Sequence, residues 1–413
     1  MKIDKNYYNF FWNVIGTTIS SFNSLFFLII ATRINGVNDA GIFTFAFSLA
    51  CLFYTLGVYS GRTYQVTENN PKLSDSDYFY SKFITCLLAL LISFIYCIIR
   101  SYSFYKVIII MSLVLFKICE SISESIFAVF QKDEKLYMVG KSLFLKAVFG
   151  LVIFTIIDYF TKNLIISCIS IFIVNFIFII FYDIMNLKSV KFKFDKFNKE
   201  NTILLLKKGF YSFGFMFLTL YVINTSKYVL DFLSTNEFQT IFGIISMPAT
   251  ILILFAQYLI QPFLTQLKLL LKTNLNKFIT LIIKLTFALL VFGILVIVLV
   301  YFFGIPVLEL MYNLNLKKYL LSLIIIIIGA IVYASSVIFS TALTTMRSTF
   351  SQFCIYLVTS IFASILSFIL IKKYSIIGAC YSYSLSMLIM LMLYIIVFIY
   401  KIRDVRRNNH DQS

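Results

Sequence analysis

Long uninterrupted runs of apolar residues are the feature that most limits what this chain can fold into. A helix that crosses the hydrocarbon core of a bilayer needs about 20 mostly apolar residues. The sequence contains twelve such runs, which predict transmembrane helices at 10–32, 41–61, 83–99, 107–130, 138–157, 164–182, 209–230, 240–267, 278–303, 319–345, 349–371 and 374–400. The predicted fold class is therefore an all-α integral membrane protein with twelve spans.

The composition agrees with membrane insertion and leaves few groups for catalysis. Hydrophobic residues make up 61% of the 413 residues and charged residues only 13%, whereas soluble domains carry about 25% charged residues. The single histidine, His410, lies in the polar C-terminal tail, and the seven cysteines show no Cys-x-x-Cys spacing. We therefore expect neither an enzyme nor a bound metal or cofactor.

The net charge of +17 comes from Lys and Arg residues that lie between the apolar runs. This distribution indicates membrane topology and not a surface for nucleic acid, because cytoplasmic loops retain positive charge during insertion. With the N-terminus inside, 22 of the 35 Lys and Arg residues fall on the cytoplasmic side and 8 on the outer side. Lys2 and Lys5 resemble the start of a signal peptide, but the first apolar run continues past Phe27 without a cleavage site. We predict twelve permanent spans with both termini in the cytoplasm.

The longest predicted cytoplasmic loop, from Asp183 to Lys208, divides the spans into six and six. Two related bundles are common in transporters that alternate access to a central site. No predicted outer loop exceeds about 15 residues, which leaves no room for an outer catalytic domain. We predict an N-terminal lobe, an inter-lobe loop, a C-terminal lobe and a cytoplasmic tail at 1–190, 191–208, 209–400 and 401–413.

Ionisable side chains occur inside only a few of the predicted spans. A charge at the bilayer centre costs ~2.5–3.5 kcal/mol on insertion scales, so such residues usually face a bundle interior or a water-filled cavity. In the fourth span, Lys117, Glu120 and Glu124 are spaced three and four residues apart and share one helix face. Lys146 in the fifth span is expected at the depth of Glu124, and we predict that these two pair. The group is interpreted either as a clasp between two helices or as part of a substrate path.

Four further charged residues are candidates for the same path. Lys227 and Asp231 lie one turn apart near the outer end of the seventh span, the level at which Arg33 ends the first span. Lys284 lies near the cytoplasmic end of the ninth span. The Lys227–Asp231 pair can instead be an anchor at the membrane surface, and the long side chain of Lys284 can reach that surface as well. Across the span interiors, five lysines stand against two glutamates, and this excess favours an anionic ligand over a cation.

The first predicted span and three further stretches of the sequence carry a resemblance to a known family. The three stretches are 31–65, which contains NDAGIFTFAFSLA, 121–150, which contains SISESIFAVFQKDEK, and 224–262, which contains NTSKYVLDFLSTNEF. Together they resemble Wzx-type polysaccharide flippases of the multidrug/oligosaccharidyl-lipid/polysaccharide exporter superfamily. The resemblance extends over essentially the whole chain in length, helix count and helix order.

The resemblance implies a V-shaped pair of six-helix lobes around a cationic cavity in the bacterial cell membrane. It also implies that the chain moves undecaprenyl-diphosphate-linked oligosaccharide units from the cytoplasmic to the outer leaflet. The expected end product is a capsule, O-antigen or exopolysaccharide, and the expected partners are membrane lipids and a polysaccharide polymerase. Family arginines near the starts of helices 5 and 7 are matched here by Lys146 and Lys227, which keep the charge but lose bidentate phosphate contact. We predict that these two lysines hold the diphosphate.

Other classes make different demands on the sequence. A drug or cation exporter of the same superfamily is expected to carry acidic residues in the first span, and there are none between Asn6 and Thr32. A major-facilitator sugar porter is expected to carry a GxxxDRxGRR-like loop after the second span, where this chain has GRTYQVTENN. A polysaccharide polymerase or glycosyltransferase is expected to carry a large catalytic outer loop, but the longest here is FGIPVLELMYNLNLKK. A structural scaffold would leave the charged spans unexplained.

Overall fold

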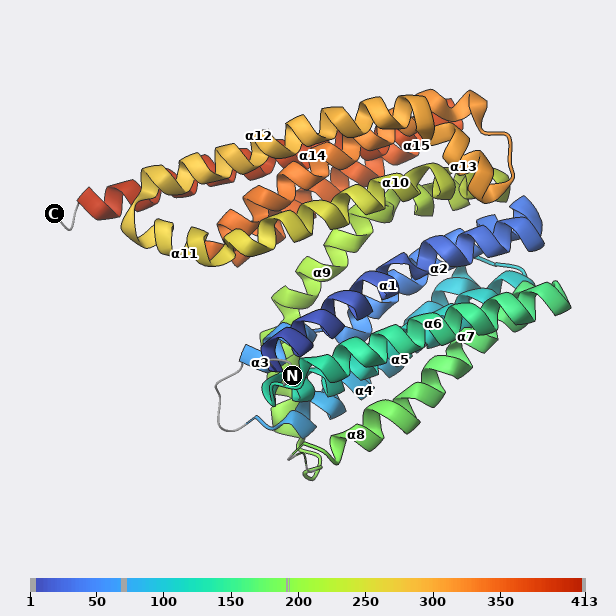
Figure 1. The fold of residues 1–413 in the computed structure, drawn as a ribbon, viewed down its shortest axis with the longest axis horizontal. Coiled ribbons are helices and arrows are strands. Elements are labelled where there is room, and N and C mark those ends of the chain that lie inside the picture. The colour runs from blue at the N-terminus through green and yellow to red at the C-terminus, as the bar shows by residue number, and fades with distance from the viewer. Residues whose placement is uncertain (1–4, 68–72, 191, 193, 411–413) are drawn as a thin grey trace. The chain divides into compact units, whose positions relative to one another are not determined.

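The computed structural model describes residues 5–67, 73–190, 192 and 194–410, and all regular structure within them is helical (Figure 1). The chain divides into two compact units, Met1–Leu220 and Tyr221–Ser413, which we call the N-terminal and the C-terminal unit. The division falls inside helix α9 (Lys199–Leu233). The predicted inter-lobe loop at 191–208 therefore already contains the first turns of this helix.

The N-terminal unit is a bundle in which the long helices pack lengthwise. Its elements are α1 (Lys5–Ile34), α2 (Gly36–Val58), α3 (Gly61–Thr67), α4 (Asp75–Ile99), α5 (Phe104–Lys132), α6 (Leu136–Thr161), α7 (Leu164–Phe178), the π-helical segment Ile179–Ile184, α8 (Met185–Leu187) and the first part of α9. Helix α1 packs along α6, and α5 packs against α2, α4 and α7. Helix α5 therefore has neighbours on several sides and forms the centre of the unit (Figure 1).

Two glycines allow α1 and α6 to approach closely. A Cβ atom added to Gly16 would lie 2.1 Å from the carbonyl oxygen of Gly140, and one added to Gly140 would lie 2.1 Å from the carbonyl oxygen of Trp12. Such small-residue contacts are typical of helix pairs in membranes, where backbone proximity and van der Waals packing replace the hydrophobic effect. This contact fixes the register between α1 and α6.

The C-terminal unit is built around α14 (Leu320–Thr345). It also contains the last part of α9, α10 (Asn236–Ile260), α11 (Leu264–Thr273), α12 (Leu275–Leu299), α13 (Ile305–Tyr312) and α15 (Thr349–His410). Helix α14 packs against α15, α10 and α12. Helix α15 is interrupted at Ser375, whose φ of 50° and ψ of −124° are not helical. This kink separates the two spans that the sequence predicts at 349–371 and 374–400.

Ten helical segments in the described part of the chain are long and apolar enough to cross a membrane. Helix α15 is one of the ten, although its kink divides it into two predicted spans. Helix α5 is not among the ten, but its 29 residues cover the predicted span 107–130, in which Lys117, Glu120 and Glu124 interrupt the apolar sequence. The all-α fold class is confirmed, and the chain is a multi-pass membrane protein.

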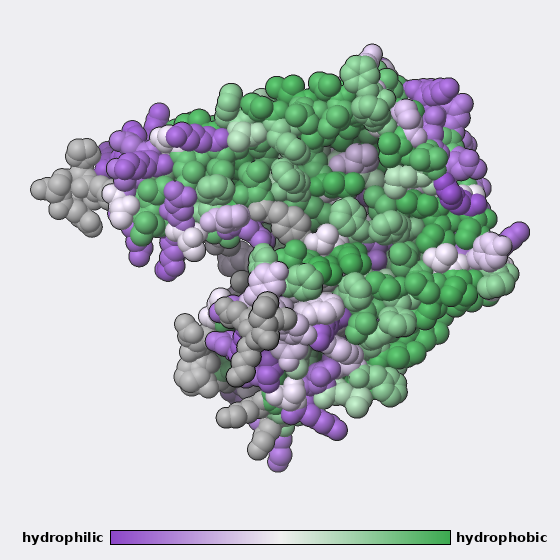
Figure 2. Space-filling model, viewed as in Figure 1, coloured by the Kyte–Doolittle hydropathy of each residue, from purple (hydrophilic) through white to green (hydrophobic). Residues whose placement is uncertain are grey.

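The outer faces of the helices are covered by large apolar side chains, while hydrophilic groups gather at the helix ends (Figure 2). On α4, Phe83, Leu91 and Ile99 are exposed, and on α12, Phe287 and Ile294 are exposed. Soluble monomers rarely carry apolar patches larger than a few hundred Å². These faces are therefore suited to contact with lipid chains.

We predict that Gly140→Ala destabilises the N-terminal unit, because its Cβ would meet the backbone of Trp12 on α1. Forcing an extra methyl group into a packed contact typically costs ~1–3 kcal/mol. The measurement is the thermal unfolding midpoint of the purified protein in detergent. The control is Gly150→Ala on the same helix, where a Cβ would meet nothing within 4 Å. Equal midpoints for the two variants would contradict the close α1–α6 contact.

Candidate functional site

The charged residues of α5 form the stripe that their spacing predicts. The Nζ atom of Lys117 donates to a carboxylate oxygen of Glu120 at 2.7 Å, one turn further along the helix. The same ammonium group lies 4.9 Å and 5.0 Å from the ring centroids of Phe116 and Phe47. The side chains of Lys117 and Glu120 remain 14% and 27% exposed. This part of α5 therefore presents a compensated but accessible ion pair.

Glu124 continues the stripe and pairs with Arg62, one of the basic residues that lie between the apolar runs of the sequence. The Nε atom of Arg62 lies 3.7 Å from a carboxylate oxygen of Glu124, and the two side chains are 29% and 19% exposed. Arg62 reaches α5 because the chain turns sharply between α2 and α3, where Gly61 has a φ of +76°. Such left-handed backbone is favourable for glycine. The stripe of Arg62, Lys117, Glu120 and Glu124 is the candidate functional site of the N-terminal unit.

Lys146 does not pair with Glu124, and this prediction was wrong. Its ammonium group donates to Asp183 and, at 2.6 Å, to the hydroxyl of Ser123. The carboxylate of Asp183 also accepts bonds from Ser123 at 2.9 Å and from Ser142 at 2.6 Å. Lys146 is 6% exposed and Asp183 is fully buried. The pair is thus sealed inside the N-terminal unit and ties α5 and α6 to the π-helical segment that follows α7.

Helix geometry explains why Lys146 pairs with Asp183 and not with Glu124. Successive residues of an α-helix are rotated by about 100°, so Ser123 and Glu124 point in different directions although they share one depth. The predicted depth of Lys146 was right, since it contacts Ser123. Asp183 was taken as the first residue of a loop, but it lies in the π-helical segment Ile179–Ile184. The only signal for its burial was the apolar sequence on its N-terminal side.

The other predicted site residues lie outside the charged stripe of α5. Lys227 and Asp231 lie one turn apart on α9, within the C-terminal unit, and both are half-buried. Arg33 is exposed at the end of α1, and Lys284 is exposed on α12. The exposure of Lys284 fits the interpretation as a membrane anchor. The structure brings Lys117, Glu120 and Glu124 together with Arg62, whereas Lys146 and Lys227 belong to different units.

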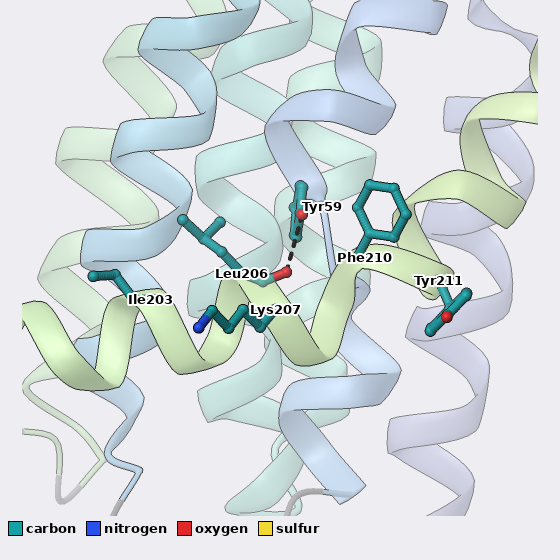
Figure 3. A pocket seen from close by; sticks show the side chains of 6 residues that line it. All are labelled: Tyr59, Ile203, Leu206, Lys207, Phe210 and Tyr211. Carbon is teal, nitrogen blue, oxygen red and sulfur yellow. Dashed lines mark hydrogen bonds between the residues drawn. The ribbon is translucent and has the colours of Figure 1, made fainter.

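A pocket of about 460 Å³ opens where the end of α2 meets the first turns of α9 (Figure 3). The hydroxyl of Tyr59 donates to the carbonyl oxygen of Leu206 at 3.0 Å, and its ring stacks on that of Phe213 with centroids 5.0 Å apart. The walls combine aliphatic and aromatic side chains with one ammonium group, a mixture suited to the boundary between lipid chains and head groups. The lining residues are Tyr59, Ile203, Leu206, Lys207, Phe210 and Tyr211.

Comparison with solved structures identifies the fold. The lipid II flippase MurJ, in an inward closed conformation, matches with a TM-score of 0.71 over 96% of this chain and 90% of MurJ, at 16% identity. The MATE multidrug transporter DinF-BH matches with a TM-score of 0.65 over 96% of this chain and 94% of DinF-BH, at 13% identity. The Vibrio cholerae MATE transporter VcmN in its bent form matches with a TM-score of 0.60 over 97% of this chain and 98% of VcmN, at 13% identity. The chain therefore has the two-lobe fold of these exporters.

One curated protein is similar in sequence over nearly its whole length. The capsular polysaccharide biosynthesis protein CapF of Staphylococcus aureus is 26% identical over 395 residues, which span 92% of this chain and 95% of CapF. No protein-family profile matches the chain. The similarity to CapF and the fold shared with MurJ and the MATE transporters confirm the resemblance that the sequence indicates.

We predict that Lys146 is energetically coupled to Asp183 and not to Glu124. Asp183→Asn should destabilise the protein by ~3–5 kcal/mol, because it leaves a buried ammonium group uncompensated. Adding Lys146→Met should recover part of that loss. Glu124→Gln and Lys146→Met should instead be additive within about 0.5 kcal/mol. Unfolding free energies of the purified variants test this, and a coupling of Lys146 to Glu124 that exceeds its coupling to Asp183 would contradict the observed pairing.

Proposed function

We propose that the chain is a flippase, not an enzyme, that moves undecaprenyl-diphosphate-linked oligosaccharide units from the cytoplasmic to the outer leaflet of a bacterial cell membrane. The similarity to CapF supports a role in surface polysaccharide synthesis, and the fold of MurJ supports movement of a lipid-linked substrate. In this proposal both termini face the cytoplasm. A polysaccharide polymerase would consume the translocated units on the outer side.

The observation that carries the proposal is the part-exposed charged stripe in helices that are otherwise apolar. A diphosphate and its sugars cannot enter hydrocarbon without losing their hydrogen bonds to water, while the prenyl chain is at home there. The protein therefore needs to shield only the head group. Cationic donors on a spanning helix compensate the diphosphate as it crosses, and alternating access opens the site to one side at a time.

The contacts of the lysines decide which of them are proposed to touch the head group. Lys117 is accessible beside Glu120, and we assign it this role together with Lys227 of the C-terminal unit. Lys146 is held by Asp183 in a sealed network. We therefore propose Lys146 as a positioning residue that keeps α5 and α6 in register, in place of the direct diphosphate contact that the sequence favours.

A drug or cation exporter is the second candidate, because DinF-BH and VcmN share the fold. Carboxylates in the first helix would favour a cationic substrate, and α1 (Lys5–Ile34) contains no Asp or Glu. The N-terminal stripe holds two cations and two carboxylates, so its net charge does not distinguish an anion from a cation, and the choice depends on α1 and on the similarity to CapF. These features favour the flippase.

We predict that the purified chain, reconstituted into liposomes, translocates a lipid-linked oligosaccharide. The lipid is placed in both leaflets, and the fraction whose sugars become accessible to an added glycosidase is followed with time. Protein-free liposomes should leave about half of the sugars protected, since a diphosphate head group does not cross unaided. Liposomes with the protein should approach complete digestion. Transport of a cationic dye without any gain in sugar accessibility would reverse the assignment in favour of the drug exporter.

We predict that Lys117→Gln slows this translocation about tenfold or more. A charge-assisted hydrogen bond to an anion contributes ~1.5–3 kcal/mol, and each 1.4 kcal/mol is a factor of ten. The control is Lys284→Gln, which makes the same change on an exposed face of α12 and should keep the wild-type rate. Rates are compared at equal amounts of reconstituted protein. Equal rates for the two variants would remove Lys117 from the path.

A further inference from the structure

Within the described residues, buried polar atoms that lack hydrogen-bond partners gather where α3, α4 and α5 meet. Three of the residues concerned, Gln65, Lys82 and Ser125, are almost completely buried, with exposures of 0% to 2%. Such atoms are uncommon in folded proteins, and each one calls for a physical explanation. The atoms are Nη1 of Arg62, Oε1 of Gln65, Nζ of Lys82 and Oγ of Ser125.

Hydrogen bonds and helix contacts tie these side chains to one place. The amide of Gln65 donates to the backbone carbonyl of Ser125 at 3.4 Å, and Gln65 lies one turn after Arg62 on α3. A Cβ on Gly57 at the end of α2 would lie 3.3 Å from Cys86 on α4 and 2.8 Å from Ser121 on α5. Lys82 precedes Cys86 by one turn and Ser125 follows Ser121 by one turn on the neighbouring antiparallel helix, so Lys82 and Ser125 lie at the same level. We call the group of Arg62, Gln65, Lys82 and Ser125 the α3–α5 junction.

Lys82 is the cation of the junction whose charge is left over. Two carboxylates border the junction. Asp75 accepts a bond from the amide of Gln65 at 3.0 Å and one from Lys132 at 2.7 Å, and Glu124 lies beside Arg62. The ammonium group of Lys82 makes no hydrogen bond within the described part of the chain, although only 2% of the residue is exposed. The hydroxyl of Thr85 on the next turn of α4 donates to the carbonyl oxygen of Gly57 at 2.8 Å. This bond holds α4 against the end of α2 and keeps Lys82 inside.

Three of these four atoms, those of Arg62, Lys82 and Ser125, are donors that one class of ligand satisfies together, whereas Oε1 of Gln65 is an acceptor. An ordered water could complete hydrogen bonds, but it would leave the positive charge of Lys82 uncompensated. An oxyanion supplies both acceptors and charge, and it fits the three donors of an ammonium group and the Nη1 donor of a guanidinium group. The hydroxyl group of Ser125 adds a further donor. Phosphate oxygens, which the proposed substrate carries, are a ligand of this kind.

We propose that the α3–α5 junction is an anion site in which Lys82 and Arg62 bind a phosphate or diphosphate group. Arg62 forms its accessible edge, since its side chain is 29% exposed and Glu124 beside it is 19% exposed. Lys82 forms its inner end. Glu124 already contacts Arg62. A phosphate that binds Arg62 therefore competes with the carboxylate of Glu124 for the guanidinium group. The inference deepens the proposed function by naming residues that take the phosphate, and it rests on that function only for the identity of the lipid.

The test measures binding to the purified full-length protein by the shift in its thermal unfolding midpoint. The probes are orthophosphate, pyrophosphate and geranyl diphosphate, each titrated against the wild type, Lys82→Met and Lys132→Met. Lys82→Met keeps the length of the side chain and removes an uncompensated charge, so without ligand it should unfold no lower than the wild type. It should weaken binding of the effective probe about tenfold or more. Lys132→Met removes a cation that Asp75 already compensates and should keep wild-type binding.

The outcomes separate the two sources of phosphate. A Lys82-dependent shift with all three probes supports the site as one for any phosphate, and a shift with geranyl diphosphate alone supports a lipid head group. Equal affinities of the wild type and Lys82→Met for every probe overturn the proposal. The liposome assay is an independent readout, because failure to move a lipid-linked oligosaccharide while Lys82-dependent binding persists would remove the proposed function and leave the anion site. Normal translocation with no Lys82-dependent binding would remove the anion site and leave the proposed function.

Discussion

The free energy of placing a charge among apolar helices organises the N-terminal unit. An uncompensated ion in such surroundings costs several kcal/mol, and this cost falls when a counterion and hydrogen bonds are provided. Lys146 meets both conditions through Asp183 and Ser123. Lys117 and Arg62 have a counterion in the carboxylates of α5. The positions of α3, α6 and the end of α7 around α5 are therefore consistent with the need to compensate charge, besides the packing of apolar surface.

Two kinds of ion pair lie on different faces of helix α5. On one face, Ser123 belongs to a network that is closed to solvent. On another, Glu120 and Glu124 keep part of their surface accessible. A closed pair has its hydrogen bonds satisfied and holds helices together, whereas an accessible pair can exchange partners with a ligand. This difference in burial separates the residues that support the bundle from those that can act on a substrate, even though both sets are charged residues within spans.

Hydropathy predicted the helices well, because the length of an apolar run is a local property that the bilayer dictates. The kink at Ser375 separates spans that the sequence also separates. Partners were harder to predict, since they come from residues far apart in the chain. Arg62 reaches α5 only through the turn at Gly61. Lys82 was counted with the loops, but α4 starts at Asp75 behind a capping box made by Ser74 and Asp77, which extends the helix through Lys82.

Helix α9 connects these local interactions to the rest of the chain. Its 35 residues correspond to about 52 Å at 1.5 Å per residue, well beyond the roughly 30 Å of a hydrocarbon core. Its first turns pack in the N-terminal unit, where Tyr59 bonds to Leu206, and its last turns belong to the C-terminal unit. Tyr59 precedes Arg62 by three residues. Tyr59, which holds α9, and Arg62, which contacts Glu124, therefore stand on either side of one short turn, so the local backbone that positions the charged stripe also anchors the helix that continues into the C-terminal unit.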